Sequence, residues 1–427
     1  MKSKKWVAIL TSLMILVVMA GVSFAEDVSY AFIKPTEDVT ITVWYAVSGK
    51  SGEAFNALLD AYQAENPNIH LEASYSGDYA ETQAKLSANL ATGTAPDVVL
   101  SSSLPLYTGG RGNFTMEALI QDPEFNVGDV YAGVWEYAKY AGHICAVPFS
   151  NSTPVLYYNK QIAAAAGLDI ENNPPATWDE LFEMGKTAQA KGNVNNSDAF
   201  WGFDTNDHTW VFNSMLGQNG NTLVAFEGDK IIPVFNNEQA QVAGNFWKKL
   251  VDEKVMPVGE HANAENAFLA GNVAFFAASS SRIPRYASSE TVEVGALPLP
   301  AFETPRVALG GALLATFSTD PVKLAASWDL IKYLASVEHQ SQYAIASGYL
   351  PIRASAMDQQ IVKDAIAANP MFEVSYKQMA NSWAYVWFDY ESVMYQCVRR
   401  AVEAIEQGTD VKEALDTGVN ELLREME

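Results

Sequence analysis

The side chains that could carry chemistry in this chain are aromatic rings, hydroxyls and amides, and no catalytic set accompanies them. The sequence contains no G-x-S-x-G elbow, no H-E-x-x-H motif and no Cys-x-x-Cys pair. Its five histidines have no metal-ligand spacing, and the run Gly49-Lys50-Ser51 has Trp44 where a P-loop requires glycine. With 50 carboxylates, an apparent acid and base pair carries little specificity. We therefore predict a protein that is not an enzyme and uses no metal or cofactor, with a secreted carbohydrate-active hydrolase as the alternative.

The ten tryptophans and nineteen tyrosines instead suggest a binding site for a polyol or sugar. Aromatic faces stack on the C–H faces of such solutes, while neighbouring hydroxyls and amides bond their hydroxyl groups. Core packing is the alternative explanation, and it suffices for most of these residues. It explains Trp201 and Trp210 less well, because both lie in a polar, glycine-containing stretch, residues 193–222, that is predicted to be a loop.

The run from Val147 to Lys160, VPFSNSTPVLYYNK, is the most informative segment of the chain. Pro148 and Pro154 fix their own φ angles and disfavour helix in the residues that precede them. Val155 to Tyr158 is apolar and aromatic, which predicts a buried strand. The run is therefore predicted to be a stiff crossover loop that carries hydroxyl groups to a ligand and leads into a strand.

The elements that must position these groups begin with a β-α-β-α-β pattern. Strands are predicted at 39–45, 69–75 and 96–100, with helices at 52–66 and 79–91 between them. Such a pattern implies a mostly parallel sheet, whose ligands lie beyond the carboxyl ends of the strands. That edge of the sheet would contain Trp44 and Tyr45, the turn at 77–79, and residues 101–103.

The remainder of the chain alternates helices and strands again. Thr177 and Glu180 form a predicted capping box at the start of a helix that ends near Gly192. Further helices are predicted at 246–251, 262–269, 321–334, 338–347 and 390–426, and strands at 273–276, 292–299 and 307–317. Breaks at Gly310-Gly311 and at residues 348–351, together with the run near residue 150, suggest a chain that crosses between two α/β lobes.

Residues 1–25 have the pattern of a secretory signal peptide, with three lysines, an uncharged stretch and a small-residue ending at Ala25. An uncleaved membrane anchor is the alternative, and no cysteine follows the apolar stretch to predict a lipoprotein. Cleavage would leave 24 of the 27 basic residues against 50 acidic ones, a formal charge of −26. Such a charge argues against nucleic-acid binding. Cys145 and Cys397 could form one disulfide or remain two buried thiols.

Several segments resemble those of the ABC-transporter extracellular solute-binding proteins (family 1), and within them the branch that binds sn-glycerol 3-phosphate. The run at 147–160 and Gly348-Tyr-Leu-Pro-Ile352 carry the resemblance most sharply, and Gly93-Thr-Ala-Pro96 adds to it. The resemblance implies an α/β two-lobe periplasmic-binding-protein fold (type II) with hinge crossings near 150, 310 and 351. It divides the chain into a signal peptide, 1–25, an N-terminal lobe, 26–148 plus 312–350, and a C-terminal lobe, 153–308 plus 354–427.

Carried over residue by residue, the resemblance also predicts ligand contacts. The family's contacts fall on Tyr79, Ser152, Ser279, Gly311 and Tyr349, and Trp210 falls on a family tryptophan that lines the cleft. Two positions depart from the pattern, because Ser103 stands where the family has a glutamate and Tyr395 where it has the phosphate-binding arginine. Arginine is the strongest phosphate anchor. Arg282 and Arg353 are the candidates to replace it.

The resemblance therefore implies the periplasmic substrate-binding component of an ABC importer, which closes two lobes over a small polyhydroxylated ligand. The ligand is expected to be sn-glycerol 3-phosphate or a glycerophosphoryl compound, or else an unphosphorylated sugar or polyol. The expected partners are the ligand and the permease subunits of the transporter, and the protein is expected to be a monomer.

Overall fold

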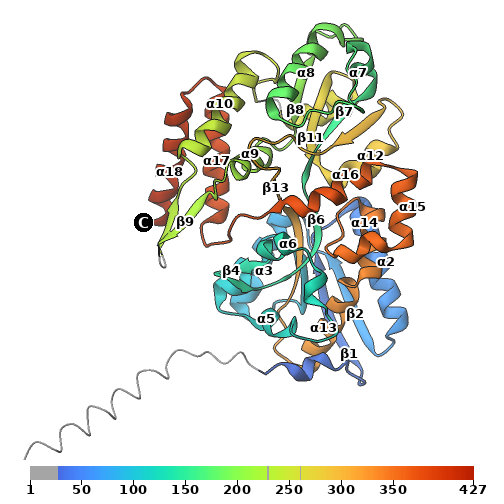
Figure 1. Cartoon of the computed structure of the whole chain (residues 1–427). Coiled ribbons are helices and arrows are strands. Elements are labelled where there is room, and N and C mark those ends of the chain that lie inside the picture. The colour runs from blue at the N-terminus through green and yellow to red at the C-terminus, as the bar shows by residue number, and fades with distance from the viewer. Residues whose placement is uncertain (1–26, 228–229, 260) are drawn as a thin grey trace, which may run out of the picture.

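A computed structural model of the chain describes residues 27–427 apart from 228–229 and 260. Two α/β lobes lie one above the other in Figure 1, joined by strands and by a helix at the waist. The predicted signal peptide, residues 1–25, lies outside the described residues. Within the described part of the chain, no helix has both the length and the apolar character needed to cross a membrane.

The lower lobe in Figure 1, lobe 1, is built on a five-stranded sheet in the order β2-β1-β3-β14-β6. Its strands are β1 (Val39–Tyr45), β2 (Ile69–Tyr75), β3 (Val98–Ser101), β6 (Val147–Ser152) and β14 (Gly310–Thr316). β1 runs parallel to β2 and β3, which confirms the predicted β-α-β-α-β start. The sheet as a whole is mixed rather than mostly parallel, because β14 returns from the other lobe antiparallel to both β3 and β6.

Four longer helices cover the sheet of lobe 1. They are α2 (Gly49–Glu65), α3 (Tyr79–Thr92), α13 (Pro321–Leu334) and α14 (Val337–Ser347), close to the predicted ranges. α3 begins with a capping box between Asp78 and Glu81 and ends at Gly93, whose φ of 70° suits a glycine. The cap fixes the first turn of α3 at the carboxyl edge of the sheet.

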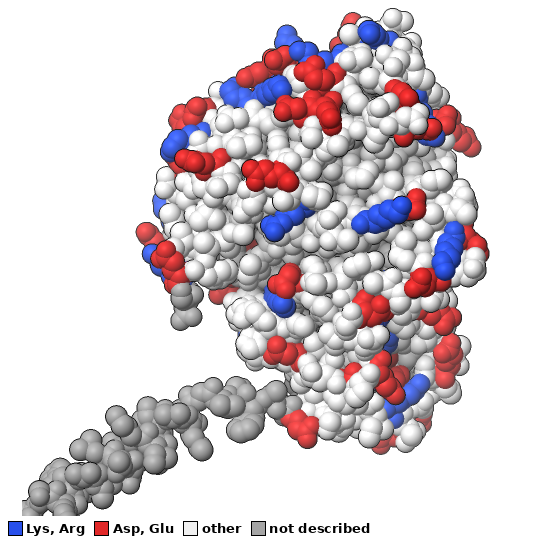
Figure 2. All heavy atoms as spheres, viewed as in Figure 1, with Lys and Arg blue, Asp and Glu red and all other residues white. Residues whose placement is uncertain are grey.

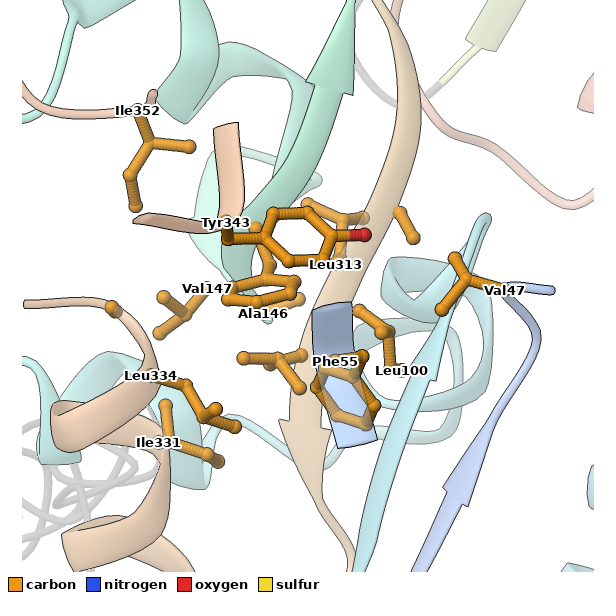
Figure 3. Packing of buried hydrophobic residues seen from close by; sticks show 14 of the residues in the cluster. Val47, Phe55, Leu100, Ala146, Val147, Leu313, Ile331, Leu334, Tyr343 and Ile352 are labelled. Atoms are coloured by element: carbon orange, nitrogen blue, oxygen red, sulfur yellow. The ribbon is translucent and has the colours of Figure 1, made fainter. Parts of the chain in front are cut away.

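The core of lobe 1 joins these helices to the strand that leads to the other lobe (Figure 3). Phe149 of β6 packs against Phe55 of α2 and Tyr343 of α14, with ring centroids 5.6 and 4.5 Å away. The Tyr343 hydroxyl also lies 2.8 Å from the Ser150 hydroxyl. The start of the crossing is therefore held inside the lobe by both apolar and polar contacts.

The upper lobe, lobe 2, has a four-stranded sheet in the order β12-β7-β11-β8. Its strands are β7 (Pro154–Asn159), β8 (Trp201–Thr205), β11 (Val273–Ser279) and β12 (Val294–Leu297). Its longer helices are α7 (Lys160–Ala166), α8 (Trp178–Lys191), α9 (His208–Gln218), α10 (Glu238–Asp252), α17 (Glu391–Glu406) and α18 (Val411–Met426). The Thr177–Glu180 capping box at the start of α8 is present as predicted.

The prediction of a loop at 193–222 is wrong, because that stretch contains β8 and α9. Trp201 opens the strand and Trp210 lies in the first turn of the helix. α9 is buried on nearly every side, from Val211 to Gln218 without a break. A helix surrounded by protein lacks the polar face that gives a surface helix its sequence period, so the sequence pattern does not show it.

Two of the three predicted crossings are present where the sequence places them. β6 belongs to the sheet of lobe 1 and β7 to that of lobe 2, so the chain crosses at Ser152-Thr153. It returns at Leu309, between β13 (Val307–Ala308) and β14. The proline-rich run is thus two strands in two different sheets, joined at the hinge.

The third crossing lies later than the predicted residue 351. The segment at 354–358 and α15 (Gln360–Ala368) pack against α14 of lobe 1. Arg353 holds them there, because its guanidinium donates to the carbonyl oxygens of Phe125 and Asn126 at 2.7 and 3.0 Å. Lobe 1 therefore extends to about residue 368, and the predicted C-terminal lobe starting at 354 begins too early.

α16 (Met371–Gln378) makes the crossing and lies between the two lobes in Figure 1. Its last residue, Gln378, donates to the Thr153 hydroxyl at 2.9 Å and to the Pro154 carbonyl at 2.7 Å. The same side chain accepts from the Leu299 amide at 2.8 Å. One buried amide thus ties the third crossing to the first.

Shorter elements complete the two lobes. They are α4 (Leu104–Tyr107), α5 (Thr115–Leu119), α6 (Ala132–Tyr137), β4 (Lys139–Tyr140), β5 (His143–Ile144), β9 (Val224–Glu227), β10 (Lys230–Pro233), α11 (Ala264–Leu269), α12 (Ile283–Ala287) and β15 (Ser382–Trp383). The two cysteines, Cys145 before β6 and Cys397 in α17, are both buried and both free. Of the two sequence interpretations, the structure therefore has two buried thiols and no disulfide between them.

Candidate ligand-binding site

A cavity of about 500 Å³ lies between the lobes, and we refer to it as the central cavity. Both lobes, the crossings and the C-terminal segment contribute to its wall. The residues are Tyr79, Ala80, Gln83, Ser102, Ser103 and Tyr137 from lobe 1, Ser152, Leu309, Gly310, Gly311 and Tyr349 from or beside the crossings, Asp207 and Trp210 from lobe 2, and Tyr385, Trp387, Glu391, Ser392, Tyr395 and Gln396 from the C-terminal segment. Seven of the twelve residues predicted from the sequence are among them.

The lobe 1 side of the cavity is the carboxyl edge of its sheet, as predicted for a ligand site. Tyr79 is the first residue of α3, directly after the capping residue Asp78. Ser103 follows β3 in a left-handed conformation, with φ of 58°, and is 7% exposed. Burial and the neighbouring Tyr349 phenol hold the pKa of Tyr79 well above its usual range. Tyr79 is therefore an uncharged hydrogen-bonding group in the wall.

The floor of the cavity is formed where the strands cross. Ser152 pairs with Gly310, and Gly311 pairs with Asn151. A side chain at Gly311 would bring its Cβ to 1.8 Å from the carbonyl oxygen of Ser150, and φ at this glycine is 114°. The Gly311 carbonyl accepts from the Tyr137 phenol at 3.2 Å. Close approach of the strands thus requires glycine at this position.

The lobe 2 side is organised by Asp207, which sequence reasoning missed. Its carboxylate caps α9 by accepting from the Trp210 amide at 3.0 Å, and it also accepts from the Tyr395 phenol at 3.0 Å. Burial raises the pKa of Asp207, while these two donors oppose that rise. The Trp210 ring lies against the floor, because a Cβ at Gly310 would be 3.0 Å from it. One carboxylate therefore positions two of the predicted contacts.

Glu391, at the start of α17, is the second acidic residue of the wall and was also missed. It is 4% exposed, and burial raises its pKa to about 7. Its hydrogen-bond partners are the Tyr385 phenol and the Ser392 hydroxyl. No lysine or arginine occurs among the described lining residues. The central cavity is consequently aromatic and acidic, with neutral hydroxyls and amides at its edges.

Trp44 and Tyr45 do not line the central cavity, although β1 ends at the same edge of the sheet. The Tyr45 ring packs on Phe55 with centroids 5.3 Å apart, and its hydroxyl accepts from Asn56 at 3.0 Å. Trp44 packs against the core of lobe 1. For these two residues the core-packing alternative is the one that the structure supports.

Ser279 and Arg282 lie outside the central cavity as well. The Ser279 hydroxyl accepts from the Ser281 amide at 3.2 Å and so caps a turn after β11. Arg282 lines a neighbouring cavity of about 830 Å³, together with Lys50 and Arg285. Tyr79 and Tyr349 line both cavities and form the wall between them.

Arg353 cannot replace the missing phosphate anchor, which corrects one of the two sequence candidates. The residue is 4% exposed and its guanidinium is committed to backbone carbonyl oxygens of lobe 1. It also lies 4.9 Å from the centroid of the Phe125 ring. Its charge fixes the chain after α14 and does not reach the central cavity.

Half of the lining residues that sequence reasoning missed come from the segment at 385–396 and from the start of α9. Asp207, two residues before the apolar stretch of α9, has the type and spacing of an N-cap and could have been found from the sequence. Tyr385, Trp387 and Glu391 carry no local signal. Their approach to the cavity depends on how the C-terminal segment runs back past lobe 1.

Charged side chains on the outer surface differ from those that line the central cavity, because both signs of charge are present. On the face shown in Figure 2, basic side chains are scattered among more numerous acidic ones over both lobes. This face therefore has the mixed charge of a solvated protein, whereas the central cavity has carboxylates and no described basic residue.

Comparison with known proteins places the fold in a family. The family model described as "Bacterial extracellular solute-binding protein" matches residues 57–373. The sn-glycerol-3-phosphate-binding periplasmic protein UgpB of Escherichia coli (strain K12) is 27% identical over 363 residues, which cover 80% of this chain and 81% of that protein.

Solved structures share the same architecture. UgpB from Mycobacterium tuberculosis, in complex with glycerophosphocholine, superposes with a TM-score of 0.76 at 24% identity, covering 91% of this chain and 99% of that one. The cyclic alpha-maltosyl-1,6-maltose binding protein from Arthrobacter globiformis gives 0.76 at 23% identity, with 90% and 98% covered. The sugar-binding protein MalE from Xanthomonas citri gives 0.77 at 20% identity, with 91% and 98% covered.

These likenesses confirm the predicted two-lobe α/β fold of periplasmic binding proteins. The relatives are substrate-binding proteins of ABC transporters and not enzymes, so the alternative of a secreted carbohydrate-active hydrolase is not supported. The family match covers about three quarters of the sequence. The chain belongs to the bacterial extracellular solute-binding proteins, and it is the solute-binding component of an ABC importer.

Proposed function

We propose that the central cavity binds a polyhydroxylated solute that carries no phosphate, a sugar or a polyol, and delivers it to an ABC permease. The observation that carries the proposal is the composition of the wall, which offers aromatic faces, hydroxyls and two carboxylates but no described lysine or arginine. Aromatic faces and oxygen acceptors are what a sugar uses. Phosphate requires charge-assisted donors, which this wall does not provide.

The position of Tyr395 supports the same proposal. Where the resemblance places the phosphate-binding arginine, this chain has a phenol that donates to Asp207. A phosphate at that point would face the Asp207 carboxylate, and two anions in a buried site repel each other. Two of the structures named above are sugar-binding proteins, which is consistent with a sugar in a cavity of this fold.

A glycerophosphoryl compound is the second candidate, and one observation favours it. Arg282, Lys50 and Arg285 line the neighbouring cavity, immediately beyond the wall formed by Tyr79 and Tyr349. The solute could then place its hydroxyls in the central cavity and its phosphate beside these cations. Glu265 already pairs with Arg285 at 3.0 Å and lies 3.8 Å from Arg282, which weakens their attraction for a phosphate.

Ligand binding is expected to close the lobes. Ser103 and Tyr79 belong to lobe 1, whereas Trp210 and Tyr395 belong to lobe 2, so a solute that touches all four binds the closed state more tightly than the open one. The Ser152-Thr153 and Leu309 crossings are the hinge of this motion. We also propose that residues 1–25 are a cleaved signal peptide and that the mature chain is a monomer of the periplasm, without a lipid anchor.

The test is a thermal-shift screen of sugars, polyols and glycerophosphodiesters, followed by titration calorimetry, because a ligand of the native state raises Tm. We expect a sugar or polyol to bind, and Trp210→Ala to abolish that binding. Tyr75→Ala removes an aromatic ring that is 50% exposed outside the cavity, and should leave binding intact. If only phosphodiesters bind and Arg282→Gln removes their binding, the second candidate replaces the first.

A further inference from the structure

Glu391 is a buried carboxylate that binding of a neutral sugar does not by itself explain. It lines the central cavity, is 4% exposed, and has only the Tyr385 phenol and the Ser392 hydroxyl as partners, the latter at 3.4 Å. Its position at the start of α17 gives it some help from the helix dipole. A carboxylate that is buried without an opposite charge is nevertheless costly to keep ionised.

The groups that face Glu391 are uncharged. Its neighbours among the titratable residues are Tyr137, Tyr385 and Tyr395, and burial raises the pKa of each of these phenols, so they remain neutral. Asp207 differs, because the Trp210 amide and the Tyr395 phenol satisfy it and Arg399 and His261 act on it. Glu391 is thus the acidic group of the cavity that no described basic side chain compensates.

Aromatic rings surround the same cavity. Trp387 lies with its ring centroid 5.1 Å from that of Tyr137 and 6.0 Å from that of Tyr385, and Trp210 and Tyr395 complete the lining. Tryptophan and tyrosine faces attract cations, and desolvation strengthens that attraction. A buried carboxylate beside several such faces, with no cation on the protein, has the composition of a receptor for an ammonium group.

We infer that the solute carries an ammonium group, which lies against the Glu391 carboxylate and the aromatic wall of the central cavity. This rests on the proposed function and narrows it, since the ligand becomes a polyhydroxylated amine of the amino-sugar class. The ammonium supplies the opposite charge that Glu391 lacks, and the sugar hydroxyls bond the serines and amides of lobe 1.

The experiment compares sugars in matched pairs by calorimetry at pH 7. Each amine is set against its hydroxyl counterpart: D-glucosamine with D-glucose, D-galactosamine with D-galactose, D-mannosamine with D-mannose, and chitosan oligomers with cello-oligomers. A charge-assisted bond to the carboxylate should make the amine of the recognised pair bind roughly tenfold tighter or more. Glu391→Gln should reduce that preference to less than roughly twofold.

Glu403→Gln is the matched control, because Glu403 lies on the same helix, outside the lining, and the substitution is the same chemical change. It should keep the preference, and Tm measured for both variants shows whether each is folded. Hydroxyl sugars that bind as tightly as their amines, or a preference that survives Glu391→Gln, would overturn the inference alone. If neither member of any pair binds and the broader sugar and polyol screen is also empty, the proposed function fails with it.

Discussion

His261→Gln should destabilise lobe 2 and remove a large part of the pH dependence of its stability. His261 is buried between two carboxylates, with Nε2 2.9 Å from Glu406 and Nδ1 3.3 Å from Asp204. These bonds raise the pKa of His261 to about 10, against the burial that would lower it. The imidazolium joins α17 to the end of β8, and therefore supports the wall that carries Trp210 and Tyr395.

The magnitude follows from the pKa. A rise from 6.5 to about 10 corresponds to about 5 kcal/mol in favour of the charged form in the folded state. Loss of one member of a buried ion pair costs about 3–5 kcal/mol, because the remaining charge is left uncompensated. Glutamine keeps an amide donor for one carboxylate, so we expect the lower part of this range.

The pH dependence has a definite sign. Because the folded-state pKa is raised, the stabilisation is fully present below the unfolded-state pKa near 6.5 and is lost as pH rises through about 10. Between these limits the native state holds one more proton than the unfolded state. The free energy of unfolding should therefore fall by about 2.5 kcal/mol from pH 7 to pH 9 on account of this residue.

The assay is urea unfolding at pH 7, 8 and 9, followed by tryptophan fluorescence. Wild type minus His261→Gln should give a difference in the free energy of unfolding that shrinks as pH rises. His208→Asn is the control, because burial and the positive charge of the neighbouring His261 lower the pKa of His208 to about 4, so His208 is neutral throughout this range. A difference that stays constant from pH 7 to pH 9 would show that His261 is neutral and would refute the reasoning.

Three further outcomes are expected. Gly311→Ala should weaken ligand binding and lower Tm by several degrees, because the new Cβ would lie 1.8 Å from the Ser150 carbonyl oxygen at a φ of 114°. The control Gly128→Ala should be tolerated, because its Cβ would meet no atom closer than 4.0 Å. Arg353→Met should lower the free energy of unfolding in urea by at least about 2 kcal/mol, because it leaves buried carbonyl oxygens without donors. The ligand affinity of the folded protein should not change. Cys145 and Cys397 should react with iodoacetamide only in denaturant, without prior reduction, as mass spectrometry of the alkylated protein would show.

Sequence patterns predicted those residues of the central cavity whose positions depend only on neighbouring strands and turns. Strand ends of a β-α-β unit lie at one edge, so Tyr79 and Ser103 could be placed from periodicity and the carboxyl-end rule. Gly311 is required by the close approach of two strands, and its glycine pair was visible as a break. The same rule failed for Tyr45, because its ring turned into the core against Phe55.

The remaining parts depend on contacts between distant segments. Glu391 and Trp387 reach the cavity only because the chain after α16 runs back between the lobes, where β15 contacts α6 of lobe 1 and pairs with β13 on the lobe 2 side. Arg353 was a reasonable phosphate candidate by residue type, yet its guanidinium meets the carbonyls of Phe125 and Asn126, over two hundred residues earlier. No periodicity encodes such a meeting, so residue type alone could not separate a binding arginine from a structural one.

The segment from Trp387 to Glu391 connects the two lobes at the wall of the central cavity. Trp387 donates from its indole to the carbonyl of Tyr137 in lobe 1, whereas Glu391, four residues later, begins a helix of lobe 2. The two residues therefore line one cavity but are fixed to different lobes. In the lobe closure proposed above, rotation changes the distance between the Trp387 ring and the Glu391 carboxylate, and the segment at 388–390 takes up the change. We therefore expect a solute that contacts both residues to bind the closed state more tightly than the open one, so that this pair contributes to closure together with the contacts at the crossings.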